Sequence, residues 1–118
     1  IGIFLGQRKK GLSMAVVPDG TQRRDFTHVR DVARANVLAM QSDKVGKGEI
    51  INIGTGKNYS VLEVAGLIGG PTVFAESMAG EVQETLADNK KAKTLLSWEP
   101  ETSFQTGLGE LKEVHGLL

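Results

Sequence analysis

Residues 18–40, PDGTQRRDFTHVRDVARANVLAM, decide how the fold of this chain is organised. Pro18-Asp19-Gly20 predicts a tight turn, because proline fixes one backbone dihedral, aspartate accepts hydrogen bonds from its own backbone and glycine tolerates positive φ. The aromatic and β-branched content of residues 26–29 predicts a short strand. Apolar residues at helical spacing then predict a helix from Val29 to Met40. The stretch is therefore expected to run as turn, strand and helix.

An arginine pair, Arg23-Arg24, lies between the turn and the predicted strand. A guanidinium in that place can bind a phosphate through parallel hydrogen bonds, or it can pair with Asp25 or Asp31 and hold the turn. Because structural ion pairs are common in folded proteins, these residues taken alone favour the structural role. Phosphate binding is the alternative at this point.

The segments on either side of this stretch predict further helices and short strands. Ser60 and Glu63 have the spacing of a capping box, and Asp88 is expected to cap a later helix. The predicted helices cover residues 1–10, 60–69, 89–96 and 103–115, and the predicted strands cover residues 14–17, 49–53, 72–74 and 84–86. Alternating helices and short strands without a repeat indicate an α/β or an α+β architecture, and we adopt the α/β class as the prediction.

The composition restricts the size, charge and compartment of the protein. Its 118 residues allow one domain or part of one, and the 14 basic residues balance the 14 acidic residues. We therefore expect no attraction to nucleic acid or to a membrane surface. No cysteine is present, and neither an apolar run of membrane-spanning length nor a leader peptide occurs. These features predict a cytoplasmic protein. Because the chain begins at Ile1 inside a predicted helix without a capping residue, we also expect a preceding part to be missing.

Several kinds of catalytic or cofactor site are not predicted by the residues. Gly54-Thr55-Gly56 lies between a predicted strand and a predicted helix, but a GxGxxG dinucleotide motif would need glycine where Tyr59 stands. His28 and His115 lie in different elements without ligand-spaced partners, so both are expected to be structural. No GxSxG nucleophile motif occurs, and no pair of carboxylates can be assembled. The sequence therefore predicts no catalytic, cofactor-binding or metal-binding residue in this chain.

Three motifs occur in a fixed order along the chain. They are GTQRRDF at 20–26 with DVA at 31–33, NIGTG at 52–56 with SV at 60–61, and GEV at 80–82 with AD at 87–88 and residues up to Pro100. In this order and spacing they resemble signatures of the NAD-dependent epimerase/dehydratase family, extended short-chain dehydrogenase/reductases that act on sugar nucleotides. The resemblance covers nearly the whole chain.

The resemblance implies that residues 1–118 are the C-terminal, substrate-binding portion of such an enzyme, and that an N-terminal Rossmann domain holding NAD is absent from this chain. In the family, the arginine before the aspartate of the first motif binds the substrate diphosphate, which implies this role for Arg24. Ala15, Val16 and Val17 would line the pocket for the nucleotide base.

One position departs from the family pattern. Many relatives carry a second diphosphate-binding arginine where Met78 stands, and a thioether cannot replace a charged bidentate donor. Either Arg23 or another residue supplies the second charge, or the substrate is bound differently. The departure leaves open whether the parent epimerises, dehydrates or reduces its substrate.

The resemblance also implies a reaction that this chain cannot carry out by itself. Family catalysis uses a Tyr-x-x-x-Lys pair, in which the tyrosine removes a hydroxyl proton while hydride passes to NAD. Here Tyr59 is followed four residues later by Glu63. We expect a homodimeric parent that binds a nucleotide-diphosphate sugar and oxidises it transiently. The alternatives are a non-catalytic nucleotide-diphosphate-binding module and an inactive truncated fragment.

Overall fold

The computed structural model describes all of residues 1–118, and the chain forms two compact units. Unit 1 contains residues 1–24, 59–85 and 105–118, and unit 2 contains residues 25–58 and 86–104. Each unit is therefore built from segments that are far apart in the sequence. The combination of helices and short strands confirms the predicted α/β class.

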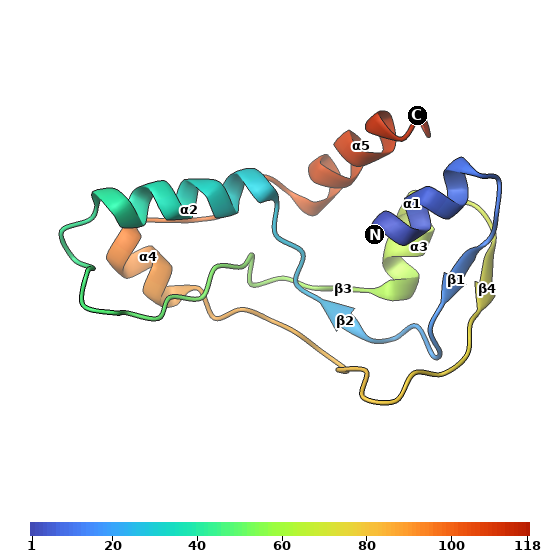
Figure 1. The fold of residues 1–118 in the computed structure, drawn as a ribbon, viewed down its shortest axis with the longest axis horizontal. Coiled ribbons are helices and arrows are strands. Elements are labelled where there is room, and N and C mark those ends of the chain that lie inside the picture. The colour runs from blue at the N-terminus through green and yellow to red at the C-terminus, as the bar shows by residue number, and fades with distance from the viewer. The chain divides into compact units, whose positions relative to one another are not determined.

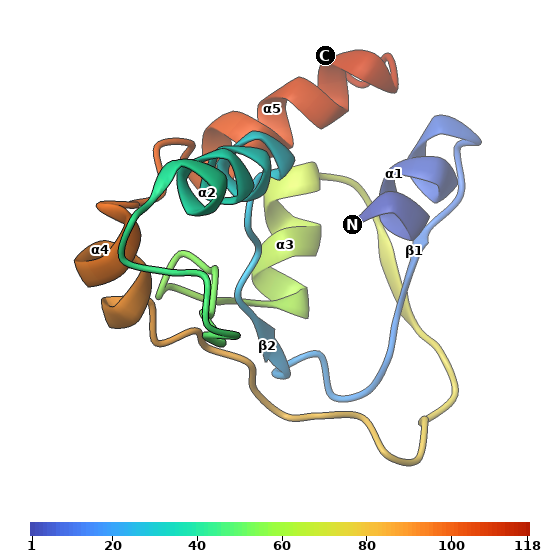
Figure 2. The ribbon, with the colours of Figure 1, turned by 60° about the vertical axis from the view of Figure 1, so that its left-hand side comes forward.

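Unit 1 holds all the strands. β1 (Met14–Val16) pairs in parallel with β4 (Thr72–Phe74), and the two run side by side in Figures 1 and 2. β2 (Arg23–Arg24) pairs antiparallel with β3 (Tyr59–Ser60). The unit also contains helices α1 (Gly2–Lys9) and α3 (Val61–Ile68), and all of α5 (Phe104–Val114) except its first residue. The predicted strands at 14–17 and 72–74 and the three predicted helices are confirmed, with ends shifted by one or two residues.

Apolar side chains of α1, β1 and α3 form the core of unit 1. These elements contact one another, and β1 directs Met14 and Val16 into the core while Ala15 between them is half-buried. The alternation is the period of two that a strand imposes on its side chains. The buried apolar residues of these elements are Phe4, Leu5, Met14, Val16, Val64, Ala65 and Ile68.

The predicted turn at residues 18–20 is confirmed and packs against the start of α3. Gly20 has φ of +85°, and its carbonyl accepts a hydrogen bond from the amide of Leu62 at 3.1 Å. A Cβ atom on Gly20 would lie 2.6 Å from Cγ of Leu62. Glycine is therefore required here both for its backbone conformation and for the close approach of α3.

Unit 2 is built around helices α2 (Val29–Gln41) and α4 (Lys90–Leu96), which contact each other. Both helices were predicted and are confirmed. Its buried cluster consists of Ala35, Ala92, Leu96 and Trp98. The N-cap of α4 is Asn89 rather than the predicted Asp88, although the Asp88 carboxylate accepts a hydrogen bond from the amide of Lys90 at 3.1 Å.

Two predicted strands are wrong. Residues 26–29 form no strand, because α2 already begins at Val29 with His28 as its N-cap; the ring of Phe26 packs on that of Phe104 at a centroid distance of 5.2 Å. Residues 49–53 also form no strand. They lack a ladder partner, and Ile51 and Ile53 pack against the buried cluster of unit 2 instead. Strand propensity describes a side-chain preference but does not supply the hydrogen-bonded neighbour that a strand needs. Of residues 84–86, Glu84 forms an isolated bridge.

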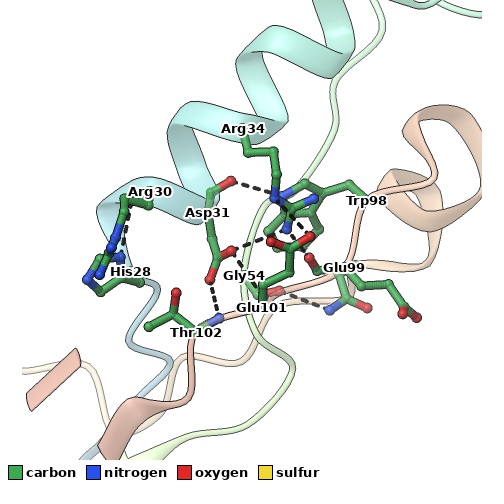
Figure 3. Close-up of polar contacts among 10 residues, drawn as sticks. His28, Arg30, Asp31, Arg34, Gly54, Trp98, Glu99, Glu101 and Thr102 are labelled. Atoms are coloured by element: carbon green, nitrogen blue, oxygen red, sulfur yellow. Dashed lines mark hydrogen bonds and ion pairs between the residues drawn. The ribbon is translucent and has the colours of Figure 1, made fainter. Parts of the chain in front are cut away.

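Asp31 connects the first turn of α2 to the segment that follows α4 (Figure 3). Its carboxylate is 2% exposed and accepts hydrogen bonds from the amides of Glu101 and Thr102, both at 3.0 Å, and from Nη2 of Arg34 at 3.2 Å. The indole N–H of Trp98 donates to the Asp31 carbonyl at 2.9 Å. One residue thus positions four others from two segments of unit 2.

The hydrogen bonds to Asp31 also set its charge. Burial by itself would raise the pKa of this carboxyl, but the amides of Thr102 and Glu101 and the Arg34 guanidinium outweigh burial and hold the pKa below its usual value. The folded protein therefore binds a proton at Asp31 less readily than the unfolded chain does. This difference stabilises the fold above the unfolded pKa of about 3.9 and is lost as the pH falls through the lower folded pKa.

We therefore expect Asp31→Asn to destabilise the protein at pH 7 by about 1–3 kcal/mol, because asparagine leaves a buried amide without an acceptor. The difference from the wild type should shrink as the pH falls below about 4, because the unfolded wild type then binds a proton at Asp31 and the stabilisation by the folded carboxylate is progressively lost. Urea denaturation at a series of pH values measures both effects. Asp43→Asn, at an exposed carboxylate in the loop after α2, is the control. A difference between Asp31→Asn and wild type that does not vary with pH would contradict this prediction.

Candidate functional site

The arginine pair lies in a short ribbon of unit 1. β2 pairs with β3 on one side, and on the other side Arg23 forms a parallel bridge with Glu84. The amide of Arg23 donates to the carbonyl of Gln83 at 2.8 Å, and the amide of Thr85 donates to the carbonyl of Arg23 at 3.1 Å. Because its backbone is held on both sides, Arg23 and its neighbour Arg24 project their side chains from a fixed base.

Arg24 is the less exposed of the two arginines. Its Nη1 donates to the carbonyl of Arg23 at 2.8 Å, and its Nη2 lies 2.8 Å from Oε1 of Glu81. The side chains of Arg24 and Glu81 are 26% and 35% exposed, so the ion pair is neither fully hydrated nor buried. One nitrogen of the guanidinium is thus used to orient it, and another is neutralised by a carboxylate.

Arg23 is paired with a carboxylate that has a second function. Its Nη1 lies 3.0 Å from Oε2 of Glu63, and the same oxygen accepts a hydrogen bond from the amide of Ser60 at 2.6 Å. Ser60 Oγ in turn accepts from the amide of Glu63 at 3.0 Å, which confirms the predicted capping box of α3. The Ser60 amide and hydroxyl, with a smaller contribution from Arg23, hold the pKa of Glu63 below its usual range. Glu63 is therefore a fixed anion.

Neither of these acidic partners was predicted. The sequence offered Asp25 and Asp31 as partners for the arginines, but Arg24 pairs with Glu81, which is 57 residues away. The glutamate of the GEV motif was the available signal, and no spacing rule connects residues so distant in the sequence.

The three predicted base-pocket residues lie at the end of β1 in unit 1. The side chain of Val16 is 1% exposed and belongs to the core, whereas Ala15 and Val17 are half-buried. The Val17 carbonyl accepts a hydrogen bond from Nε2 of Gln22 at 3.1 Å. Gln22, which is buried, thereby links the end of β1 to the residue before β2. Contact of residues 15–17 with a nucleotide stays a prediction.

Asp25 organises the glycine loop of unit 2. Its Oδ1 accepts hydrogen bonds from the amide and hydroxyl of Thr55 at 3.0 and 2.6 Å, and its Oδ2 accepts from the amides of Gly56 and Ala87 at 2.9 and 3.2 Å. Burial opposes the charge, but these hydrogen bonds outweigh it and hold the pKa of Asp25 below its usual value. Asp25 therefore holds the glycine loop in place.

The same contacts test whether the glycine loop fits the phosphates of NAD. A dinucleotide-binding loop needs free backbone amides to approach the pyrophosphate. Here the amides of Thr55 and Gly56 are used by Asp25, and residues 49–53 before the loop form no strand. The residues of this loop do not fit the cofactor.

The remaining polar candidates have structural contacts. Nδ1 of His28 accepts a hydrogen bond from the amide of Arg30 at 3.2 Å and caps α2, and Nδ1 of His115 lies 2.8 Å from the carbonyl of Leu111. His, Cys, Asp and Glu side chains nowhere gather in a group of three or more that could hold a metal ion. Every helix is too short or too polar to cross a membrane.

Comparison with known proteins gives matches over almost the whole chain. Residues 1–54 match the NAD dependent epimerase/dehydratase family. The chain is 39% identical to the putative UDP-glucose 4-epimerase of Methanocaldococcus jannaschii over 114 residues, which are 92% of this chain and 36% of that protein. It is 41% identical to the UDP-glucose 4-epimerase of Corynebacterium glutamicum over 90 residues, or 71% of this chain and 27% of that protein.

Comparison with solved structures also gives UDP-sugar epimerases. The fold resembles UDP-glucuronic acid 4-epimerase from Bacillus cereus in complex with UDP-glucuronic acid and NAD, with a TM-score of 0.89, 32% identity and coverage of 97% of this chain and 38% of the other. UDP-glucose 4-epimerase from Thermotoga maritima with UDP-glucose has a TM-score of 0.80 and 35% identity, over 90% of this chain and 35% of the other. The chain thus spans about a third of the length of the proteins it matches.

The contacts of the glycine loop predict opposite effects for two glycine substitutions. A Cβ atom on Gly54 would lie 2.3 Å from Cβ of Ala87, an atom that no side-chain rotation can move, and 3.0 Å from Oδ2 of Asp25. Gly54→Ala should therefore lower the free energy of unfolding by about 1–3 kcal/mol. Gly66, inside α3, has open space around it, so Gly66→Ala should raise that free energy by about 0.5–1 kcal/mol.

Urea denaturation of the two glycine variants beside the wild type checks both signs. Equal effects of Gly54→Ala and Gly66→Ala would show that the approach of Ala87 to the loop is not a constraint in solution.

Proposed function

Since the chain belongs to the NAD-dependent epimerase/dehydratase family, we propose that it is the C-terminal, substrate-binding portion of an NAD-dependent nucleotide-sugar epimerase. The observation that carries the proposal is the similarity to UDP-sugar epimerases over 92% of this chain and only 36% of the relative. Activity, substrate and partners of the complete enzyme are parts of the same proposal. A UDP-sugar is the substrate class favoured by the names of the relatives.

Arg24 is the residue that we propose to bind the substrate diphosphate. A guanidinium can direct two parallel N–H groups at phosphate oxygens, which a point charge cannot do. The Arg24 side chain is oriented by the carbonyl of Arg23 and is about a quarter exposed, so it is both positioned and reachable. Arg23 is proposed as the second positive charge near the diphosphate. Residues 15–17 are proposed to line the base pocket.

NAD and the catalytic groups are proposed to lie in a portion of the enzyme outside this chain. When bound, NAD would accept hydride from a sugar hydroxyl carbon and return it. Tyr59 is followed by Glu63 at the position of the family's lysine, and Glu63 is held in a capping box. The role of this chain is therefore to bind and orient the nucleotide sugar. A homodimeric parent and a cytoplasmic location stay predictions.

The proposed role of Arg24 predicts a loss of substrate affinity in Arg24→Ala. Removing a charge-assisted hydrogen bond to a diphosphate should weaken UDP-glucose binding by the complete enzyme about tenfold to a hundredfold. Arg24→Lys should recover part of the loss, because it keeps the charge without the planar fork. Titration calorimetry measures the affinities, and Arg30→Ala, at an exposed arginine of α2, is the control. Equal affinities of wild type and Arg24→Ala would refute the assignment.

A second prediction concerns the gene. If the chain is the C-terminal portion of an epimerase, the coding sequence upstream of Ile1 should contain, in frame, a GxxGxxG motif followed by Tyr-x-x-x-Lys. Sequencing that region tests it directly. A start codon immediately upstream would instead support a module without its own catalytic groups.

A further inference from the structure

We propose that Glu81 regulates the affinity of the diphosphate site by occupying the guanidinium of Arg24 while no substrate is bound, an inference that rests on the proposed function of Arg24. The structure carries it through one contact: Nη2 of Arg24 lies 2.8 Å from Oε1 of Glu81. A carboxylate and a phosphate compete for the same N–H groups of arginine. Substrate binding therefore exchanges an internal ion pair for an external one.

The geometry of Arg24 makes this exchange local. Nη1 donates to the carbonyl of Arg23 at 2.8 Å, and this bond lies within the fixed base of β2. An entering diphosphate can leave that bond intact, because only the contact of Nη2 with Glu81 has to break. The guanidinium is thus already oriented when its second nitrogen becomes available.

The two arginines differ in how firmly their carboxylates are held. Glu63, the partner of Arg23, also accepts the amide of Ser60 at 2.6 Å and closes the capping box of α3. Displacing Glu63 would therefore break a helix cap as well as an ion pair. The Glu81 carboxylate has Arg24 as its one partner and lies in residues 75–83, which contain no helix or strand. Arg24 is therefore the arginine that an anionic ligand can separate from its carboxylate partner.

Charge gives the direction of the effect. Nη2 of Arg24 and Oε1 of Glu81 lie 2.8 Å apart, so the two opposite charges largely cancel. While this ion pair is intact, an anionic ligand approaches a pair with no net charge. After the exchange the freed carboxylate is still attached nearby and repels the ligand. Both effects weaken binding of a diphosphate and neither affects a ligand without phosphate. Glu81 is therefore a positioning residue that tunes affinity through Arg24.

The test compares Glu81→Gln with wild type in the complete enzyme, with UDP as the probe and titration calorimetry as the measurement. Glutamine keeps the shape of the side chain and removes its charge. For a partly exposed ion pair we expect UDP to bind about twofold to fivefold more tightly. Uridine, which has no phosphate, should bind equally to both. Glu76→Gln removes the same charge from an exposed position of the same segment and should leave UDP affinity unchanged.

Two further variants separate this inference from the proposed function. In an Arg24→Ala background, Glu81→Gln should no longer change UDP affinity, because the two substitutions act on one interaction. If Arg24→Ala weakens UDP binding but Glu81→Gln leaves it unchanged or weakens it, the role of Glu81 is overturned and that of Arg24 stands. If Arg24→Ala has no effect, the diphosphate assignment fails, and the role of Glu81 fails with it.

Discussion

The arginine site depends on the backbone pairing of β2. Two residues cannot form a stable strand by themselves, and β2 exists because β3 pairs with it on one side and Gln83 to Thr85 bind Arg23 on the other. These neighbours come from parts of the chain that are about 35 and 60 residues downstream of the arginines in the printed sequence. The hydrogen bonds of this ribbon fix the backbone from which the two long arginine side chains project. The same pairing brings Glu63 and Glu81 within reach of the two guanidiniums.

Carboxylates organise both units in the same physical way. Asp25 and Asp31 in unit 2 and Glu63 in unit 1 each accept hydrogen bonds from backbone amides that would otherwise lack a partner, and the pKa of each is lowered. Two of the three are the aspartates of the first motif. Asp25 holds the glycine loop, and Asp31 holds the segment after α4.

The proposed division of labour follows from what this chain contains and what it lacks. It offers an oriented guanidinium but no lysine after its tyrosine, and its glycine loop has given its amides to Asp25. In the proposed enzyme, this chain would hold the anionic part of the nucleotide sugar, while NAD and the catalytic groups would lie outside it. In the proposed enzyme, the contact of Arg24 with Glu81 is therefore the point at which affinity for the diphosphate would be set.

The sequence by itself determined the local elements: the turn at residues 18–20, the helices, the capping box of Ser60 and Glu63 and the strands β1 and β4. These depend on residues close together in the chain, where dihedral preferences, capping and periodicity act. The order of the three motifs also pointed to the family. Only the tertiary structure decided that residues 26–29 and 49–53 form no strand and that Arg23 and Arg24 form one. It also decided that Arg23 pairs with Glu63 and that Arg24 pairs with Glu81. A strand and an ion pair need a partner in space, and a partner 57 residues away is chosen by the packing of the whole unit rather than by the residues beside it.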